Sequence, residues 1–256
     1  MMNHFIIWKD IRLFYGSHAR SVTQHSHPII QFVVAVEGTF QSKDVNGNWM
    51  QHKGLLLAPN HAHECDANGI EIISVEIDPE SNLGEWILSN QLKSDQIIEY
   101  PSTQISSIDT KTIVGLIKNE NWAGIRQIIE SSLDFKSAVE TVNKEKRIQE
   151  VVNYIKANIK QEITTQQLME VAHLSESRLL HLFKEIKGLP IRNYILWHRL
   201  QIVLKQLLDG QLLTTAAYEA GFSDQAHLSR TFTKMIGVPP SLIAKNSKFI
   251  QVSFPQ

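Results

Sequence analysis

The chain of 256 residues contains a single cysteine, Cys65. One thiol cannot form an intrachain disulfide framework, and it cannot supply the paired cysteines of a Cys-based zinc finger. Long apolar runs are also missing: the longest, such as residues 32–36, are far shorter than the about 20 residues that cross a bilayer. The first residues lack a basic segment followed by an apolar segment and a small-residue cleavage site. We therefore expect a cytoplasmic protein with no membrane partner.

The chain as a whole has no large excess of one charge sign, but its two halves do. The total is 25 Lys and Arg against 26 Asp and Glu, a net charge of −1. Residues 1–140 carry 10 basic and 17 acidic residues, whereas residues 147–246 carry 12 and 8. An acidic front half and a basic back half indicate a sensor or enzyme joined to a segment that meets polyanions. Two domains are also what this length favours.

The first eighty residues have the pattern of short strands. Residues 70–77 alternate between apolar and polar side chains, as a half-buried strand does. Asn46-Gly47 lies between two short extended segments and is a strong signal for a hairpin turn. Short strands separated by turn residues predict a small β-barrel or sandwich over residues 1–80.

The period changes to a helical one after residue 81. An apolar stripe at helical spacing comprises Trp122, Ile125, Ile128, Ile129 and Leu133. Residues 81–140 are therefore expected to form one or two helices that either make a dimer seam or cover the barrel. The polar stretch 141–146 has no apolar period, and we interpret it as a linker.

The C-terminal segment is helical and repeats itself at an offset of 49 residues. The identical pairs are Thr165 and Thr214, Glu170 and Glu219, Leu179 and Leu228, Phe183 and Phe232, Gly188 and Gly237, and Pro190 and Pro239. One register held over so many positions means that one supersecondary unit is used twice. That unit is a short helix, a turn, a second helix with a polar face, and Gly-x-Pro, which is the pattern of a helix-turn-helix.

The segment between the two repeats predicts how they could act together. Residues 191–208 carry an apolar stripe, and Gly210 follows as a helix stop. A helix of this length spans roughly 27 Å at about 1.5 Å per residue. Successive major-groove segments on one DNA face are about 34 Å apart, so this strut would let both repeats enter DNA from one chain.

The second repeat closely resembles the signature of the AraC/XylS family of transcription regulators. The resemblance rests on residues 220–232, Ala-Gly-Phe-Ser-Asp-Gln-Ala-His-Leu-Ser-Arg-Thr-Phe, and on Gly237-Val238-Pro239-Pro240. It extends over residues 147–246 and implies a double helix-turn-helix domain that binds promoter DNA. Two positions depart from the pattern: His173 stands where a small residue is common, and Ala244 stands where an arginine often follows.

The resemblance also implies which side chains face the DNA. They are Ser177, Leu180, His181 and Lys184 in the first repeat and Gln225, Ala226, His227, Arg230 and Thr233 in the second. Arg230 can form a bidentate contact with guanine or hold a phosphate, and Gln225 can read adenine. Leu180 suits a thymine methyl group, whereas His181 is a weaker donor near neutral pH. The alternative for Arg230 is a solvated side chain or an ion pair with Asp224.

The front half resembles the cupin family, whose barrels serve as sensors in many AraC-type regulators. The resemblance rests on His25, His27, Gln31 and Gly38 for the first motif and on Pro59 and His63 for the second. It implies an effector pocket lined by His25, His27, Gln31 and His63. Three histidines could also hold a metal, but Gln31 is neutral where metal-binding cupins place a carboxylate. We therefore expect no stoichiometric metal and no cofactor.

Together these patterns predict an α+β protein: a cupin-like barrel with flanking helices, and an all-α domain of two helix-turn-helix units joined by a helix. The expected domains are 1–80, 81–140, the linker 141–146, 147–246 and a tail, 247–256. The expected function is a one-component transcription regulator, a homodimer that senses a small molecule and binds double-stranded promoter DNA. The resemblance is also compatible with a contact to RNA polymerase. The alternative is a metal-dependent cupin enzyme with a helical appendage, which would have no reason to carry the repeat.

Overall fold

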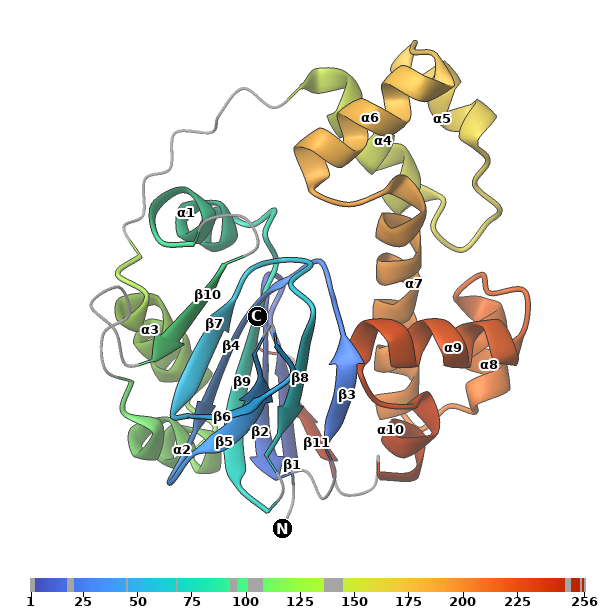
Figure 1. Cartoon of the computed structure of the whole chain (residues 1–256). Helices are drawn as coiled ribbons and strands as arrows, with labels where there is room; N and C mark the ends of the chain where they lie inside the picture. Colours follow the sequence, from blue (N-terminus) through green and yellow to red (C-terminus); the bar gives the residue numbers. More distant parts are fainter. Residues whose placement is uncertain are drawn as a thin grey trace. The chain divides into compact units, whose positions relative to one another are not determined.

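The computed structural model describes residues 3–17, 21–44, 46–67, 69–92, 96–100, 108–135, 145–246, 250–253 and 255. The chain divides into two compact units, Met1–Val139 with Lys248–Gln256, and Glu140–Ser247. The described strands all lie in the first unit, and the described part of the second is built from helices (Figure 1). The predicted α+β class is thereby confirmed.

The strands of the first unit form two sheets. The described strands of the larger sheet run in the order β10-β7-β4-β9-β2-β1-β11. Their bounds are β1 Asn3–Ile7, β2 Ile11–Ser17, β4 Ile30–Ala35, β7 Gly54–Leu57, β9 Glu71–Ile77, β10 Ile97–Tyr100 and β11 Ile250–Ser253. The smaller sheet has the order β3-β8-β5-β6. Its strands are β3 Val22–His25, β5 Phe40–Lys43, β6 Trp49–His52 and β8 His63–Asp66.

Strand alternation divides the apolar side chains of the larger sheet between two layers. In β4, Phe32 and Val34 belong to one buried cluster, and Val33 and Ala35 belong to another. The second cluster includes Phe40 of the smaller sheet, so it lies between the sheets. Two sheets that share an apolar layer are compatible with a cupin-like barrel, which stays a prediction.

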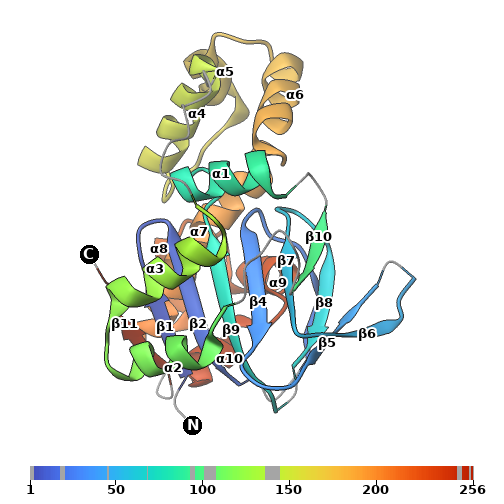
Figure 2. The same ribbon diagram turned by 90° about the vertical axis from the view of Figure 1, so that its left-hand side faces the viewer.

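Three helices cover the other face of the larger sheet (Figure 2). They are α1 Asn82–Asn90, α2 Thr110–Lys118 and α3 Trp122–Ser132. Ile125, Ile129 and Leu133 are buried in one cluster with the sheet residues, and Trp122 and Ile128 pack against it. Of the two roles expected for this apolar stripe, the structure shows that it covers the sheet.

Two strands fall where none was expected. β10 lies within residues 81–140 and pairs with β7, and β11 in the tail pairs in parallel with β1. Both have only four residues, too short for a periodic pattern to stand out from the surrounding sequence. Residues 141–144 of the expected linker lie outside the described residues, and Lys146 already begins a helix.

The second unit consists of helices at the positions that the repeat predicts. Its described helices are α4 Lys146–Ala157, α5 Thr165–Ala172, α6 Glu176–Lys187, α7 Ile191–Leu208, α8 Leu213–Glu219, α9 Gln225–Ile236 and α10 Pro240–Asn246. α6 and α9 begin and end at residues separated by the same 49 positions, and their equivalent residues Phe183 and Phe232 are fully buried. Among all described helices, none has the length and apolar character that a membrane span requires.

Candidate nucleic-acid interface and histidine cluster

Capping residues set the ends of the two candidate recognition helices, α6 and α9. Both helices end at a glycine, and α9 also has a side-chain cap at its start. Gly188 and Gly237 end them with φ angles of 71° and 79°, a left-handed conformation that glycine adopts at little cost. At the start of α9, Oδ1 of Asp224 accepts a hydrogen bond from the backbone N–H of His227 at 2.7 Å. This hydrogen bond lowers the pKa of Asp224. Asp224 therefore caps α9, and no ion pair with Arg230 is found among the described residues.

The predicted contact residues of α6 lie on one exposed stripe. Ser177, Leu180, His181 and Lys184 are all exposed, and Leu180 keeps 42% of its surface accessible although it is a large apolar side chain. Their spacing of three, four and seven residues places them on one face of the helix. His181 lies 3.6 Å from Glu185, a pair that is ionic only when the histidine is protonated.

The predicted residues of α9 divide into exposed and partly held side chains. Gln225, Ala226 and Arg230 are exposed. Thr233 is half-buried, and its hydroxyl donates to the backbone carbonyl of Ser229 at 3.0 Å. His227 is also half-buried and lies with its ring 5.5 Å from that of Phe222. DNA contact by these side chains stays a prediction, but all nine expected residues have accessible surface.

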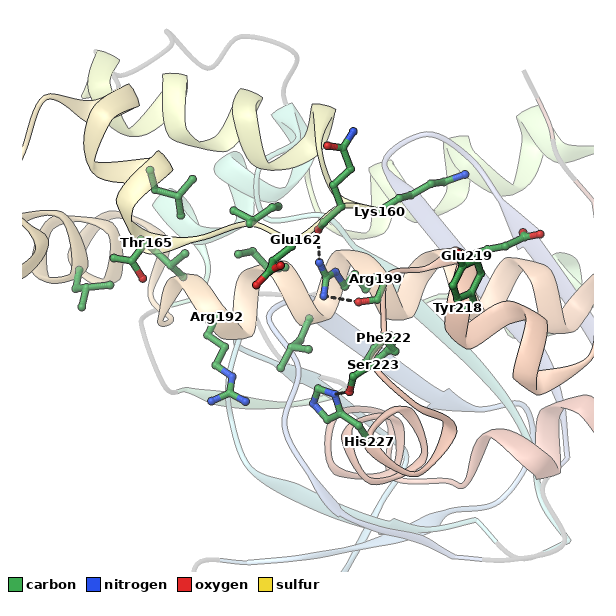
Figure 3. Close-up of a pocket in the computed structure, with 18 residues that line it drawn as sticks. Lys160, Glu162, Thr165, Arg192, Arg199, Tyr218, Glu219, Phe222, Ser223 and His227 are labelled. Carbon is green, nitrogen blue, oxygen red and sulfur yellow. Dashed lines mark hydrogen bonds between the residues drawn. The ribbon is translucent and has the colours of Figure 1, made fainter.

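A hollow of about 920 Å³ lies between the two candidate recognition helices (Figure 3). Leu180 of α6 and His227 of α9 both line it. Other lining residues, among them Thr165, Arg192 and Tyr218, were not predicted from the sequence, because they come from three different helices. Tyr218 is 83% exposed, a signal that sequence alone does not give.

In the first unit, the strand register brings three histidines together. His25 of β3 pairs directly with His63 of β8, and their ring centroids are 4.1 Å apart. The ring of His27 lies 5.4 Å from that of His25 and 5.0 Å from that of His63. All three side chains are buried, and one nitrogen from each lies within 4.8 Å of the others.

The outer nitrogens of this histidine cluster are held by oxygen acceptors. Nδ1 of His25 lies 2.9 Å from the carbonyl oxygen of Thr23, and Nδ1 of His63 lies 2.9 Å from that of His61. A carbonyl only accepts, so Nδ1 carries the proton in both rings and Nε2 keeps its lone pair. Nε2 of His63 is buried without a hydrogen-bond partner in the described structure.

Gln31 connects the cluster to the larger sheet. Its Oε1 lies 3.2 Å from Nε2 of His27, and its Nε2 donates to the hydroxyl of Ser74 at 3.1 Å. The amide oxygen of Gln31 is thus engaged with the ring of His27. The structure brings together all four residues that were predicted to line the effector pocket.

Burial keeps the cluster uncharged. It lowers the pKa of His25 and of His63, and it lowers the pKa of His27 to about 3. Neutral imidazoles with one ring nitrogen held by an acceptor are the form that binds Zn, Fe, Cu or Ni. The donor set therefore fits a transition metal as well as the polar group of a small molecule. Among the described residues, no carboxylate or thiol joins the three histidines.

Comparisons with known proteins agree with this architecture. A helix-turn-helix domain family matches residues 168–246. The probable transcriptional regulator LumQ of Photobacterium leiognathi is 23% identical over 241 residues, which cover 87% of this chain and 92% of LumQ. The uncharacterized HTH-type transcriptional regulator YbfP of Bacillus subtilis (strain 168) is 29% identical over 98 residues, 38% of this chain and 33% of YbfP.

A solved structure shares the fold over nearly the whole chain. ToxT from Vibrio cholerae matches with a TM-score of 0.60 at 13% identity, covering 94% of this chain and 99% of that one. The repeated helices, their exposed faces and the matching domain family define a DNA-binding protein of the helix-turn-helix class. Residues 168–246 carry the helix-turn-helix domain that the resemblance in residues 220–240 implied, and the chain is similar to a probable transcriptional regulator over most of its length.

Proposed function

We propose that the chain binds promoter DNA by placing α6 and α9 in two successive major-groove segments. The observation that carries this proposal is the repeat of one helix at the same length and register, with exposed faces on both copies. Within the second unit, α7 joins the two helix-turn-helix units; its 18 residues form a strut of roughly 27 Å. That length suits two half-sites about 34 Å apart on one face of the duplex.

The nine predicted side chains divide the work of recognition. Arg230 and Gln225 read base edges, Leu180 contacts a thymine methyl group, and Lys184 pairs with a phosphate. Arg230 is exposed, and its charge contributes to the lowered pKa of Asp224 without a hydrogen bond or ion pair between the two described residues, which supports a guanidinium available to DNA. The remaining five, Ser177, His181, Ala226, His227 and Thr233, complete the two contact faces.

The first unit is proposed to bind a small-molecule effector. His25, His27, Gln31 and His63 form the polar lining of its pocket, since the three histidines are buried together and Gln31 lies 3.2 Å from the ring of His27. One solved structure of ToxT is that of the unsaturated fatty acid bound protein, with a TM-score of 0.56 at 12% identity. That precedent supports a small organic effector rather than a metal, as does the lack of an anionic ligand beside the three histidines.

The proposal includes a cytoplasmic homodimer that carries no catalytic activity. The regulatory assignment supports a non-enzymatic role. A contact with RNA polymerase at the promoter is compatible with this function. The burial of the apolar stripe of α3 inside the first unit favours a dimer surface other than this stripe.

Selection of binding sites from random duplex DNA tests the proposal. The purified full chain is expected to enrich a site with two conserved segments separated by one helical turn, about 10 base pairs from centre to centre. Binding should weaken steeply with salt, because neutralised phosphates release counterions. Failure to enrich any sequence, with no duplex binding at low salt, would contradict the proposed function.

A further inference from the structure

Arg199 links the loop before the first helix-turn-helix unit to the turn of the second unit through backbone carbonyls. It lies in the middle of α7, and its guanidinium donates three hydrogen bonds. Nε bonds the carbonyl of Ile159 at 3.0 Å, Nη2 bonds that of Gln161 at 2.6 Å, and Nη1 bonds that of Gly221 at 2.7 Å. The dashed lines in Figure 3 show how the fork reaches in two directions.

Two of the carbonyls lie just before the first helix-turn-helix unit, and the third lies inside the second unit. Ile159 and Gln161 lie in the loop between α4 and α5, whereas Gly221 lies in the turn between α8 and α9. The loop and the turn also meet directly. A Cβ atom on Gly221 would lie 2.9 Å from the carbonyl oxygen of Lys160 and 3.2 Å from the guanidinium carbon of Arg199. Gly221 therefore combines a φ of +80° with a close approach that only glycine permits.

The proposed function, on which this inference rests, requires α6 and α9 to keep a fixed relative position. Along the chain, residues 188–190 connect α6 to α7, whereas residues 209–212 connect α7 to α8, which the turn of residues 220–224 joins to α9. α7 packs against helices of both helix-turn-helix units, and on the first side the ring of Tyr194 lies 5.4 Å from that of Phe183. The hydrogen bonds of Arg199 add a polar link between the loop and the turn. A planar guanidinium presents its donors in a rigid fork, whereas a lysine ammonium is a point charge on a flexible stem.

We propose that Arg199 is a positioning residue that fixes the spacing and rotational phase of α6 and α9, and so makes the regulator selective for one half-site separation. It acts through the loop and the turn, not through contact with DNA. Holding both helices in the binding geometry before association also lowers the ordering cost of binding. Loss of the fork should reduce affinity for the natural site and broaden the range of spacings that the protein accepts.

The test uses the full chain and the operator obtained by selection, together with duplexes that carry one or two base pairs inserted or removed between the half-sites. The unaltered protein should lose at least about tenfold in affinity when the spacing changes by two base pairs, because the second half-site rotates away. Arg199→Gln should bind the natural operator roughly tenfold more weakly and should lose less than about threefold on the altered spacings.

Arg192→Gln is the matched control. Arg192 lies on the same helix, is exposed, and makes no hydrogen bond or ion pair with the other described residues. Its replacement removes the same charge and should leave the dependence on spacing as steep as in the unaltered protein. Arg199→Lys keeps the charge without the fork, so it should behave as Arg199→Gln does.

Thermal unfolding of each variant separates loss of positioning from loss of the fold. If Arg199→Gln does not fold, the milder Arg199→Lys carries the test alone. A folded Arg199 variant with an unchanged spacing profile overturns this inference but leaves the proposed function intact. Absence of any two-segment site for the unaltered protein would instead refute the proposed function itself.

Discussion

The side chains expected to meet DNA differ in how firmly the protein already holds them. Arg230 projects from α9 without a hydrogen bond or ion pair to other described residues. His181, its equivalent in the first repeat, lies near Glu185, and Thr233 is bonded to its own helix. A side chain that breaks no existing contact on binding gives more net affinity. Arg230 should therefore contribute more than its equivalent does.

Replacing Arg230 tests this difference. If Arg230 reads a guanine, Arg230→Ala should cost about 1–3 kcal/mol on the selected site and relax selectivity at one base pair. His181→Ala, at the equivalent position, should cost less. Titration of both variants against the selected site and its single-base variants measures these effects. Equal affinity of Arg230→Ala and the unaltered chain for every duplex would show that Arg230 does not face DNA.

The buried histidines make the stability of the first unit depend on pH. Their pKa values are lowered by burial, that of His27 to about 3, while histidine in an unfolded chain titrates near 6.5. Between the two values the unfolded chain binds more protons, so stability is full above about pH 6.5 and falls as pH drops below it. Urea unfolding of chelator-treated protein from pH 7 to pH 5 should show this loss.

His27→Gln is the variant that checks the cause. It removes the most strongly shifted group and should make unfolding of the first unit less sensitive to pH over the same range. The second unit supplies an internal comparison, since the cluster does not include its residues. An unchanged pH slope in His27→Gln would mean that this histidine is not the titrating group.

At the scale of elements, the sequence predicted the repeated helices but not the two shortest strands of the larger sheet that lie outside the first eighty residues. The 49-residue register located α6 and α9, because buried Leu179, Phe183 and their equivalents recur with the helical period. β10 and β11 were missed, since four-residue strands are decided by the partner strand that they find. The histidine cluster was implied by the resemblance to the cupin motifs, but the junction at Arg199 was not predicted, because carbonyl acceptors carry no sequence signal.

β11 has a consequence for stability. It pairs in parallel with β1, which would otherwise be the edge of the larger sheet. Deleting residues 250–256 removes that pairing and should destabilise the first unit by roughly 1–3 kcal/mol, because a few backbone hydrogen bonds are lost. The exposed edge should also promote association between chains. Thermal unfolding and light scattering measure both effects.

The control for this deletion is a chain that lacks only residues 254–256. It keeps β11 and should unfold like the intact protein. Equal stability of the longer and the shorter deletion would show that β11 contributes nothing to the sheet in solution.

At the scale of the whole molecule, basic and acidic residues are concentrated in different parts of the chain. The segment with a basic excess, residues 147–246, contains the helix-turn-helix units, and the acidic excess lies in residues 1–140. This distribution supports the proposal that DNA meets the second unit and that the first unit binds the effector. An effector can alter DNA affinity only if it binds the DNA-competent and incompetent states unequally.

The occupant of the histidine cluster is open to direct measurement. We predict no stoichiometric metal, because three neutral imidazoles supply no negative charge and Gln31 is engaged with His27 and Ser74. Elemental analysis of protein purified without chelator or a histidine tag checks this. One equivalent of metal per chain that is lost in His27→Ala would contradict the prediction and assign the cluster to a metal.

The central claim is that one chain reads DNA with two recognition helices held a helical turn apart. A hydroxyl-radical footprint of the purified full chain on its selected operator tests it most directly. The account predicts two protected segments on one face of the duplex, about 10 base pairs apart from centre to centre, for each bound chain. A single protected segment per chain, or no protection on any duplex at low salt, would contradict it.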